Sequence, residues 1–396
     1  MSRIPVLVQK FGGTSVSTPE RRRHVVEHVR RAQADGYQVA IVVSAMGRRG
    51  DPYATDTLLD LLRSDGGQVA PADYDLMFTC GETISAAVVS QALRRAGMPA
   101  LGMTAAQARI YTDGLHIEAS IEEIDTSRLH SLMAAGLVPV VTGGQGVARA
   151  TLDFTTLGRG GSDTSGVALG VALGACRVEI FTDVDGVAVV DPRIIPGARV
   201  LARVSYAAMY ELARFGAKVV HPRALLAGWK GRTPIVVRST FSEAPGTLID
   251  EVEDDAPLVG LALLPPMETV VLPAGAIDTA TREAWERVRL VMSIDDGRGA
   301  GLLAGATDDK LMELRDGLAE TAVLPVRSEG RCCWLSVIGE AGALREHHPL
   351  WVTRLGQQAI AVYGHELTER RCTYVIPDAA RARAAEIVYG TGDWRA

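Results

Sequence analysis

The chain has 396 residues, of which 47 % are hydrophobic and 22 % charged, and its formal net charge is −6. This composition is typical of a soluble globular protein long enough for two or three domains. The acidic balance argues against a general nucleic-acid binder, and no apolar run approaches the roughly 20 residues that span a bilayer. The N-terminus also lacks the charged-then-apolar pattern of a signal peptide.

Cysteines and histidines give no pattern of a metal site or a disulfide framework. The five cysteines are scattered and lack CxxC spacing: Cys80, Cys176, Cys332, Cys333 and Cys372. An odd, scattered set favours reduced thiols in a cytoplasmic protein. Cys80 has no histidine or other base motif beside it, so we expect a packed thiol. No residues are predicted as metal ligands, and His347-His348 is predicted to lie in a loop before Pro349.

The first motif follows an apolar run at 4–8 that predicts a buried strand. It reads Lys-Phe-Gly-Gly-Thr-Ser-Val over residues 10–16. The two glycines let the backbone approach a bulky ligand, and Thr14 and Ser15 offer hydroxyls where a helix could begin. Amide groups at such a turn, with the charge of Lys10, suit a phosphate. An ordinary strand–turn–helix entry explains the segment alone equally well, because the P-loop pattern is absent.

The first 250 residues alternate strand-like and helix-like segments. We predict further strands at 39–44, 138–142, 178–182 and 234–238, and helices at 86–96 and 165–174. Such alternation predicts an α/β domain with a mainly parallel sheet and helices on both faces. Ligands of such sheets bind beyond the carboxyl ends of the strands, where several polar motifs of this chain fall.

A glycine-rich cluster, Leu-Gly-Arg-Gly-Gly-Ser-Asp-Thr-Ser at 157–165, precedes one of these helices. Its glycines permit close backbone approach, and the helix start favours an anion. Arg159 could grip a carboxylate with two hydrogen bonds, and Asp163 could orient a lysine or work through a metal. A glycine-rich surface turn is the alternative.

Other polar motifs occur along the same region. Thr-Asp-Val-Asp-Gly-Val at 182–187 and Asp-Pro-Arg at 191–193 are interpreted as part of a nucleotide pocket. Lys218, within 216–222, is a second candidate phosphate contact, and a solvated lysine is its alternative. Lysine is scarce, since only four of the 41 basic residues are lysines, at 10, 218, 230 and 310. Ser44, Thr55 and Glu82 lie in weaker motifs and could contact a polar substrate.

The acidic stretch at 250–255 predicts a linker over residues 251–257. After it the pattern changes to two strand–helix–strand units. The first, about 258–330, has strands predicted at 269–272 and 290–293 around a helix at 279–288. The second has a strand at 333–337, paired strands at 360–365 and 371–376, and a helix at 379–388. These units predict one or two small α+β modules.

Taken in order, the motifs resemble those of the aspartate kinases of the amino-acid kinase superfamily. The resemblance covers about residues 1–250 and rests on the segments 10–16, 44–47, 54–59, 81–82, 155–165, 182–187, 191–193 and 216–222. The segment between the motifs at 44–47 and 54–59 is longer than in many members of the family. In this respect the chain resembles the branch that includes diaminopimelate-sensitive enzymes. The resemblance implies an amino-acid-kinase-like αβα sandwich at 1–250. It also implies paired ACT-like regulatory and dimerisation modules at 258–396, the first of them divergent.

The resemblance also implies a reaction and a set of site residues. The reaction is ATP- and Mg²⁺-dependent phosphorylation of the side-chain carboxylate of L-aspartate to 4-phospho-L-aspartate, towards lysine or diaminopimelate, threonine and methionine. The implied catalytic residues are Lys10, Asp163 and Lys218. The implied nucleotide contacts are Lys10, Phe11, Gly12, Gly13, Ser44, Ser162, Thr182, Asp183, Ala188, Asp191, Pro192, Arg193 and Lys218. The implied aspartate contacts are Thr55, Glu82, Arg159, Gly160, Gly161 and Ser162.

One departure and two alternatives accompany this interpretation. Ala188 stands where the family often has an aromatic residue near adenine, so the adenine contact is open. The chain could instead be a kinase for another acidic amino acid, such as glutamate. It could also be a catalytically silent amino-acid-binding homologue, which would be expected to have a broken Lys10 or Asp163 motif; both are intact. We expect a homodimer or higher homo-oligomer with weakened or altered control by an amino-acid effector, and no nucleic-acid or membrane partner.

Overall fold

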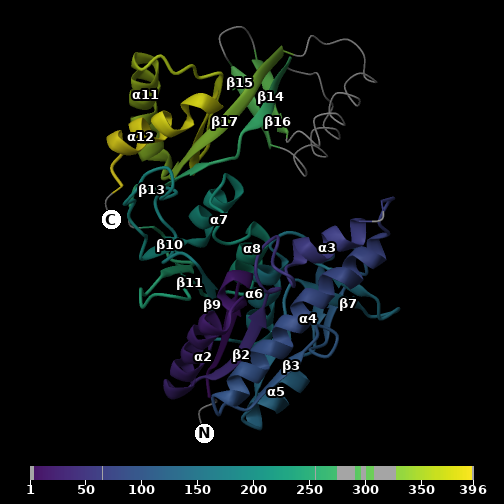
Figure 1. The fold of residues 1–396 in the computed structure, drawn as a ribbon. Coiled ribbons are helices and arrows are strands. Elements are labelled where there is room, and N and C mark those ends of the chain that lie inside the picture. Colours follow the sequence, from purple (N-terminus) through teal and green to yellow (C-terminus); the bar gives the residue numbers. More distant parts are fainter. Residues whose placement is uncertain are drawn as a thin grey trace. The chain divides into compact units, whose positions relative to one another are not determined.

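The computed structural model describes residues 4–64, 66–254, 256–273, 290–295, 300–306 and 327–394. The chain divides into two compact units, each of which can be followed in Figure 1. The first unit consists of Met1–Val187, Val200–Tyr206 and Val219–Val252. The second consists of Ala188–Arg199, Ala207–Lys218 and Glu253–Ala396. The second unit thus includes two short segments from the region that the sequence assigns to the kinase, and the boundary at 251–257 stays a prediction.

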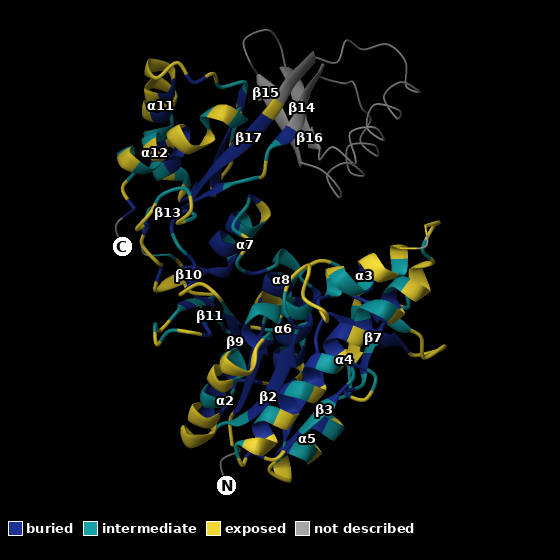
Figure 2. Cartoon of the chain, viewed as in Figure 1, coloured by how far each residue is buried: buried dark blue, intermediate teal, exposed yellow. Residues whose placement is uncertain are grey.

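An eight-stranded sheet forms the centre of the first unit, in the order β10-β12-β11-β9-β1-β2-β6-β3. Neighbouring strands are parallel except β11 and β12, which confirms the predicted, mainly parallel α/β sheet. Figure 2 shows these strands as largely buried. The strands are β1 (Val6–Phe11), β2 (Gln38–Val43), β3 (Ala100–Met103), β6 (Val138–Thr142), β9 (Arg177–Thr182), β10 (Arg203–Ser205), β11 (Ile235–Ser239) and β12 (Thr247–Asp250).

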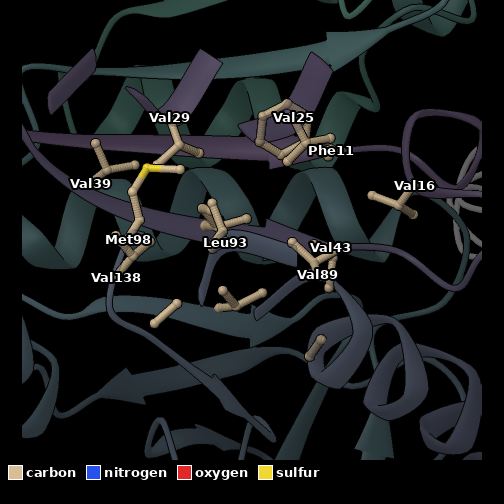
Figure 3. Close-up of a cluster of buried hydrophobic side chains, with 14 of the residues drawn as sticks. Phe11, Val16, Val25, Val29, Val39, Val43, Val89, Leu93, Met98 and Val138 are labelled. Atoms are coloured by element: carbon tan, nitrogen blue, oxygen red, sulfur yellow. The ribbon is translucent and has the colours of Figure 1, made fainter. Parts of the chain in front are cut away.

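Helices cover both faces of this sheet. The helices of this unit are α1 (Gly13–Val16), α2 (Pro19–Ala34), α3 (Thr55–Arg63), α4 (Pro71–Arg95), α5 (Ser127–Ala134), α6 (Gly161–Leu173) and α8 (Pro222–Lys230). Of these, α3 packs on α4. On one face, valines and leucines of α2 and α4 pack against alternate residues of β1, β2 and β6, including Leu7 and Phe11 (Figure 3). Burying one such side chain contributes about 1.5–3 kcal/mol. Because strand side chains alternate, Val8 and Lys10 point to the opposite face, where α6 packs.

Helix α4 is longer than the predicted segment at 86–96, since it begins at Pro71. The motif around Glu82 therefore lies inside a helix. By length and composition α4 could cross a membrane, contrary to the sequence-based expectation, but its buried face packs on the sheet of the first unit. Cys80 lies on its exposed side, so the prediction of a packed thiol was wrong; its thiol donates to the carbonyl of Leu76 over 3.5 Å.

A second, four-stranded sheet of the first unit was not predicted. Its order is β5-β4-β7-β8, with β4 (Ile110–Thr112), β5 (Ile121–Ile124), β7 (Gln145–Ala148) and β8 (Phe154–Thr156). These strands are three or four residues long, too short for a clear alternation of polar and apolar residues. Strand β8 ends one residue before the glycine-rich cluster at 157–165, so this sheet leads directly into the candidate site.

The second unit contains an antiparallel sheet in the order β15-β16-β14-β17-β19-β18, with β13 also paired to β17. Its strands are β13 (Leu258–Leu263), β14 (Met267–Pro273), β15 (Leu290–Asp295), β16 (Ala300–Ala306), β17 (Arg327–Gly339), β18 (Gly364–Leu367) and β19 (Arg371–Pro377). Its helices are α7 (Tyr206–Arg214, which begins in the first unit), α11 (Ala341–Gln357), the 3₁₀ turn η1 (Asp378–Ala380) and α12 (Arg381–Thr391). A C-terminal α+β region with an antiparallel sheet confirms the predicted fold class.

Three details of this unit bear on the sequence predictions. The segment at 360–363 was predicted as strand, but the strand begins only at Gly364, and it pairs with β19 as expected. The loop prediction at His347-His348 was wrong, because both residues and Pro349 lie inside α11. The helix predicted at 279–288 lies outside the described residues.

Candidate active site

The ion pair between Lys10 and Asp163 lies at the centre of the candidate site. Its two atoms, Lys10 Nζ and Asp163 Oδ1, are 2.6 Å apart, and the side chains are 9 % and 14 % exposed. Strand alternation turns Lys10 towards α6, whose first turn carries Asp163. Gly166, one turn further along α6, lies close against the aliphatic part of Lys10. The structure thus brings together two predicted catalytic residues that are 153 positions apart.

The turn after β1 lies close to the loop after β2. A Cβ atom at Gly13 would overlap with the carbonyl oxygen of Ala45, so glycine is required here for the packing of these two backbone segments. An approach of the glycine pair to a ligand stays a prediction. The amide of Gly47 donates to the Gly13 carbonyl over 3.0 Å, and the amide of Gly12 donates to the carbonyl of Phe181 over 3.3 Å. The Phe11 ring is fully buried on the core face, stacked on Phe181. Any contact of Phe11 with a ligand is therefore left to its backbone.

The start of α6 faces this turn. Gly160 has a left-handed backbone (φ +67°), and a Cβ atom there would overlap with the ring of His221. Burial lowers the pKa of His221 from its ordinary value, and the charge of Asp163 opposes that shift. The Ser44 hydroxyl donates to the Ser162 hydroxyl over 3.0 Å. The turn after β1, the loop after β2 and the start of α6 therefore form one glycine-lined wall of the first unit.

Glu82 is the second buried acid of the site. It is 2 % exposed, and its Oε1 atom accepts hydrogen bonds from the Ala45 amide at 3.2 Å and the Thr55 hydroxyl at 3.4 Å. The Oε2 atom is buried and has no hydrogen-bond partner within the described part of the chain. Burial raises the pKa of Glu82 to about 8, against the opposing effect of these hydrogen bonds. The structure therefore brings Thr55 and Glu82 together as predicted and leaves one carboxyl oxygen available.

Other buried polar atoms near these elements also lack partners among the described residues. They are the Ser85 and Thr142 hydroxyls and both amide atoms of Gln145. Ser85 lies one turn after Glu82 on α4, and Thr142 ends β6 beside Val43 of β2. Buried polar groups are normally hydrogen-bonded, so unpartnered ones indicate a place for a polar ligand or water. These residues were not predicted from the sequence. The position of Gln145 directly after the pair Gly143-Gly144 was a signal that could have identified one of them.

The loop that carries Arg159 is fixed at both ends, while Arg159 itself is exposed. The Arg223 guanidinium donates to the carbonyls of Leu157 and Ala119, each over 2.8 Å. Gly161 packs against the backbone of Gly144, where no larger residue would fit. No ion pair of Arg159 occurs within the described ranges, so its guanidinium is available for a ligand carboxylate.

Asp75 was missed by the sequence analysis and lies in a network behind that loop. It is fully buried on α4 and accepts from the Thr156 hydroxyl at 2.5 Å and the Ile117 amide at 3.0 Å. His116 Nδ1 lies 2.8 Å from its second oxygen. Asp75 thus ties the helix that carries Glu82 to the strand that leads to Arg159. A charged residue among the core-facing positions of an amphipathic helix was the signal that could have identified it.

Thr182 ends β9, and Asp183 follows it. The Thr182 hydroxyl donates to Asp183 over 3.3 Å, and Arg48 pairs with Asp183 at 2.8 Å. Both members of this ion pair are largely exposed, so the pair contributes little stability. It joins the loop after β2 to the end of β9.

The remaining predicted residues belong to the second unit. These residues are Ala188, Asp191, Pro192, Arg193 and Lys218. The Arg193 guanidinium contacts Asp191 at 2.6 Å and lowers the pKa of that carboxyl, and the charge of Lys218 lowers it further. Their part in nucleotide binding stays a prediction.

The residues present in the first unit fit a nucleotide phosphate. Gly13 allows a close backbone approach, and Lys10 supplies a buried positive charge beside the start of α6. Mg²⁺ is usually held by one or two carboxylates together with substrate phosphates and water, and a Mg²⁺ ion bound here would have Asp163 as a candidate ligand.

Comparison with known proteins shows that the chain is similar to amino acid kinases, and among them to aspartokinases. The model of the amino acid kinase family matches residues 5–239. Aspartokinase 1 of Bacillus subtilis is 47 % identical over 244 residues, which cover 62 % of this chain and 60 % of that protein. The aspartokinase of Thermus thermophilus is 41 % identical over 260 residues, or 65 % and 63 % of the two chains. The chain thus spans about 60 % of the length of these curated relatives, and the predicted resemblance is confirmed there.

Solved structures extend the likeness to nearly the whole chain. Escherichia coli aspartokinase III, in complex with aspartate and ADP, has a TM-score of 0.77 at 21 % identity and covers 97 % of this chain and 99 % of that one. The aspartate kinase of Synechocystis has a TM-score of 0.57 at 28 % identity, covering 97 % and 68 % of the two chains. The first of these likenesses bears on the fold alone, and it includes the C-terminal α+β region.

Proposed function

The chain belongs to the amino acid kinase family, and from that premise we propose that it phosphorylates the side-chain carboxylate of L-aspartate with ATP. The observation that carries the proposal is the placement of two acids beside the loop after β2. The Ala45 amide of that loop donates to Glu82, and its Ser44 hydroxyl donates to Ser162, the residue before Asp163. One, Asp163, is neutralised by Lys10, and the other, Glu82, has an unpartnered oxygen. The first pair suits a phosphate, and the second acid suits the α-ammonium of an amino acid. The aspartokinase relatives support aspartate as that amino acid.

Phosphoryl transfer requires positioning and charge neutralisation more than a protein nucleophile. Aspartate's side-chain carboxylate is ionised near neutral pH, so no general base is needed. We propose that Lys10 stabilises the negative charge of the transferred group while Asp163 holds the ammonium of Lys10 in place. ATP with Mg²⁺ supplies the phosphoryl group and offsets its charge. Arg159 binds a carboxylate of aspartate, and Glu82 with Thr55 binds its ammonium.

The roles of the second unit's residues follow the same proposal. Asp191, Arg193 and Lys218 contact the nucleotide, and Ala188 leaves the adenine contact without an aromatic ring. We also propose a cytoplasmic homodimer or larger homo-oligomer in which feedback by an amino-acid effector is weakened or altered. Steady-state assays with lysine, threonine and diaminopimelate test the last point, and strong inhibition by any one of them would contradict weakened feedback.

The function is tested by trapping the acyl phosphate with hydroxylamine in the presence of ATP, Mg²⁺ and a panel of amino acids. We expect hydroxamate formation with aspartate and none above background with glutamate. Hydroxamate with glutamate instead would identify a kinase for another acidic amino acid. Amino-acid binding without any hydroxamate would identify a catalytically silent homologue.

A further inference from the structure

Two segments of the predicted kinase region fold with the C-terminal sheet. Residues 188–199 and 207–218 belong to the second unit, together with everything from Glu253 onwards. They carry Asp191, Arg193 and Lys218, which the sequence assigns to nucleotide binding. Leu212 of one segment and the carbonyl oxygen of Val189 of the other both lie against Gly260 of β13, so the two segments meet on this strand. The C-terminal sheet is therefore the scaffold on which these predicted nucleotide contacts are held.

Strand β13 contacts both segments through its backbone. The amide of Leu261 donates to the carbonyl of Val189 over 2.7 Å, two residues before Asp191. The carbonyl of Leu263 lies against Gly216, whose φ of +128° and lack of space exclude any Cβ atom. Gly216 is two residues before Lys218. A shift of β13 would consequently move both predicted nucleotide segments.

Arg371, at the start of β19, provides the side-chain link between the sheet and α7. It is 8 % exposed, and its Nε atom lies 3.2 Å from Glu211 on α7. A second guanidinium nitrogen lies 2.5 Å from Glu366 on β18. The guanidinium carbon is 4.0 Å from the centroid of the Phe215 ring, just after α7. The guanidinium of Arg371 also donates a hydrogen bond to the Thr373 hydroxyl.

The chemistry of this contact makes it specific to arginine. A planar guanidinium can contact two carboxylates and an aromatic face at once, which the ammonium of a lysine does not reproduce. Removing the guanidinium leaves Glu211, whose side chain is 22 % exposed, without its partner, so we expect α7 to shift towards solvent. Lys218 follows α7 by four residues and would move with it.

We propose that Arg371 is a positioning residue for ATP: it holds α7 on the C-terminal sheet and thereby fixes Lys218 and Asp191 for the nucleotide. The inference rests on the proposed function in that these two residues are taken as nucleotide contacts. It assigns to a residue of the C-terminal region an influence on nucleotide binding that acts through α7 and is separate from the binding of the amino-acid substrate.

The test compares Arg371→Ala with Arg370→Ala in the full chain. Arg370 is the neighbouring exposed residue, paired only loosely with Glu253 at 3.8 Å. Binding of a non-hydrolysable ATP analogue with Mg²⁺ is measured by calorimetry, and KM for ATP and for aspartate by the hydroxamate assay. For Arg371→Ala we expect about tenfold weaker analogue binding and a matching rise in KM for ATP. KM for aspartate should stay within about twofold of wild type, and Arg370→Ala should resemble wild type.

Milder variants keep the test decisive if Arg371→Ala does not fold. Arg371→Lys and Glu211→Gln should both weaken analogue binding while the thermal unfolding transition remains cooperative. Unchanged analogue binding in the folded variants, or an equal rise of both KM values, would overturn the inference. Should the wild-type protein bind the analogue without phosphorylating aspartate, the proposed function would fall while the calorimetric comparison still decides the role of Arg371.

Discussion

The region around Lys10 and the region around Glu82 both contain an acid with little exposure to solvent, but they differ in how its charge is compensated. Asp163 forms a 2.6 Å ion pair with Lys10. Glu82 receives only neutral donors, and its pKa rises to about 8 because it is buried. In the first region Asp163 already holds the Lys10 ammonium in place, whereas the protonated carboxyl of Glu82 becomes ionised when a cation binds beside it. The difference separates a preformed phosphate contact from an acceptor site that is completed by its substrate.

The largest effect should come from breaking the completed pair. In Lys10→Ala the phosphoryl group loses its buried cation, so turnover should fall by about 10²- to 10³-fold while the fold survives. Lys10→Met, which retains an aliphatic stem against Gly166, should lose as much turnover with less loss of stability. The exposed Lys230→Ala serves as the matched control. Near-normal turnover in Lys10→Ala would remove Lys10 from the mechanism.

Neutralising the other acid should affect substrate binding more than turnover. Glu82→Gln keeps the shape of the side chain but cannot pair with an ammonium, so KM for aspartate should rise about 30-fold. KM for ATP should change little, because the Lys10–Asp163 pair is intact. The exposed Glu122→Gln is the control. Equal changes in the two KM values would show that the two regions are not distinct.

The pH dependence of stability provides a sharper test of Glu82 without any ligand. Its pKa is raised from 4.5 to about 8, so between these values the folded protein holds a proton that the unfolded chain has released. Stability therefore falls as pH rises through this window, by up to about 1.4 kcal/mol per pH unit from this one group. Urea unfolding of wild type and Glu82→Gln between pH 5 and pH 8 measures the difference, and parallel curves would refute the raised pKa.

The smallest effect is expected at the support behind both regions. Asp75→Asn can no longer accept all the hydrogen bonds from Thr156, Ile117 and His116, so the loop before Arg159 should loosen. We expect KM for aspartate to rise about fivefold and the free energy of unfolding to fall by about 1–3 kcal/mol. Asp73→Asn, at an exposed position two residues earlier, should behave as wild type. A stability loss without any change in KM would limit Asp75 to a structural role.

The turns at the motifs and the mainly parallel sheet could be predicted from the sequence, because glycine turns and β-branched runs are local signals. It could not predict that Lys10 meets Asp163, since that contact depends on α6 packing on the face to which Lys10 points. The burial that raises the pKa of Glu82 was equally inaccessible, because the helix around it was expected to begin only at residue 86. The second unit's segments at 188–199 and 207–218 were missed for a related reason: packing against β13 is a long-range contact.

The account is tested most directly by counting protons when aspartate binds at pH 7. Calorimetric titration in two buffers of different ionisation enthalpy gives that number. If Glu82 is mostly protonated in the free protein and pairs with the substrate ammonium, about 0.9 proton should be released per aspartate bound, and Glu82→Gln should release none. Binding of aspartate without proton release, or with the same release in Glu82→Gln, would contradict the assignment of Glu82 as the ammonium site.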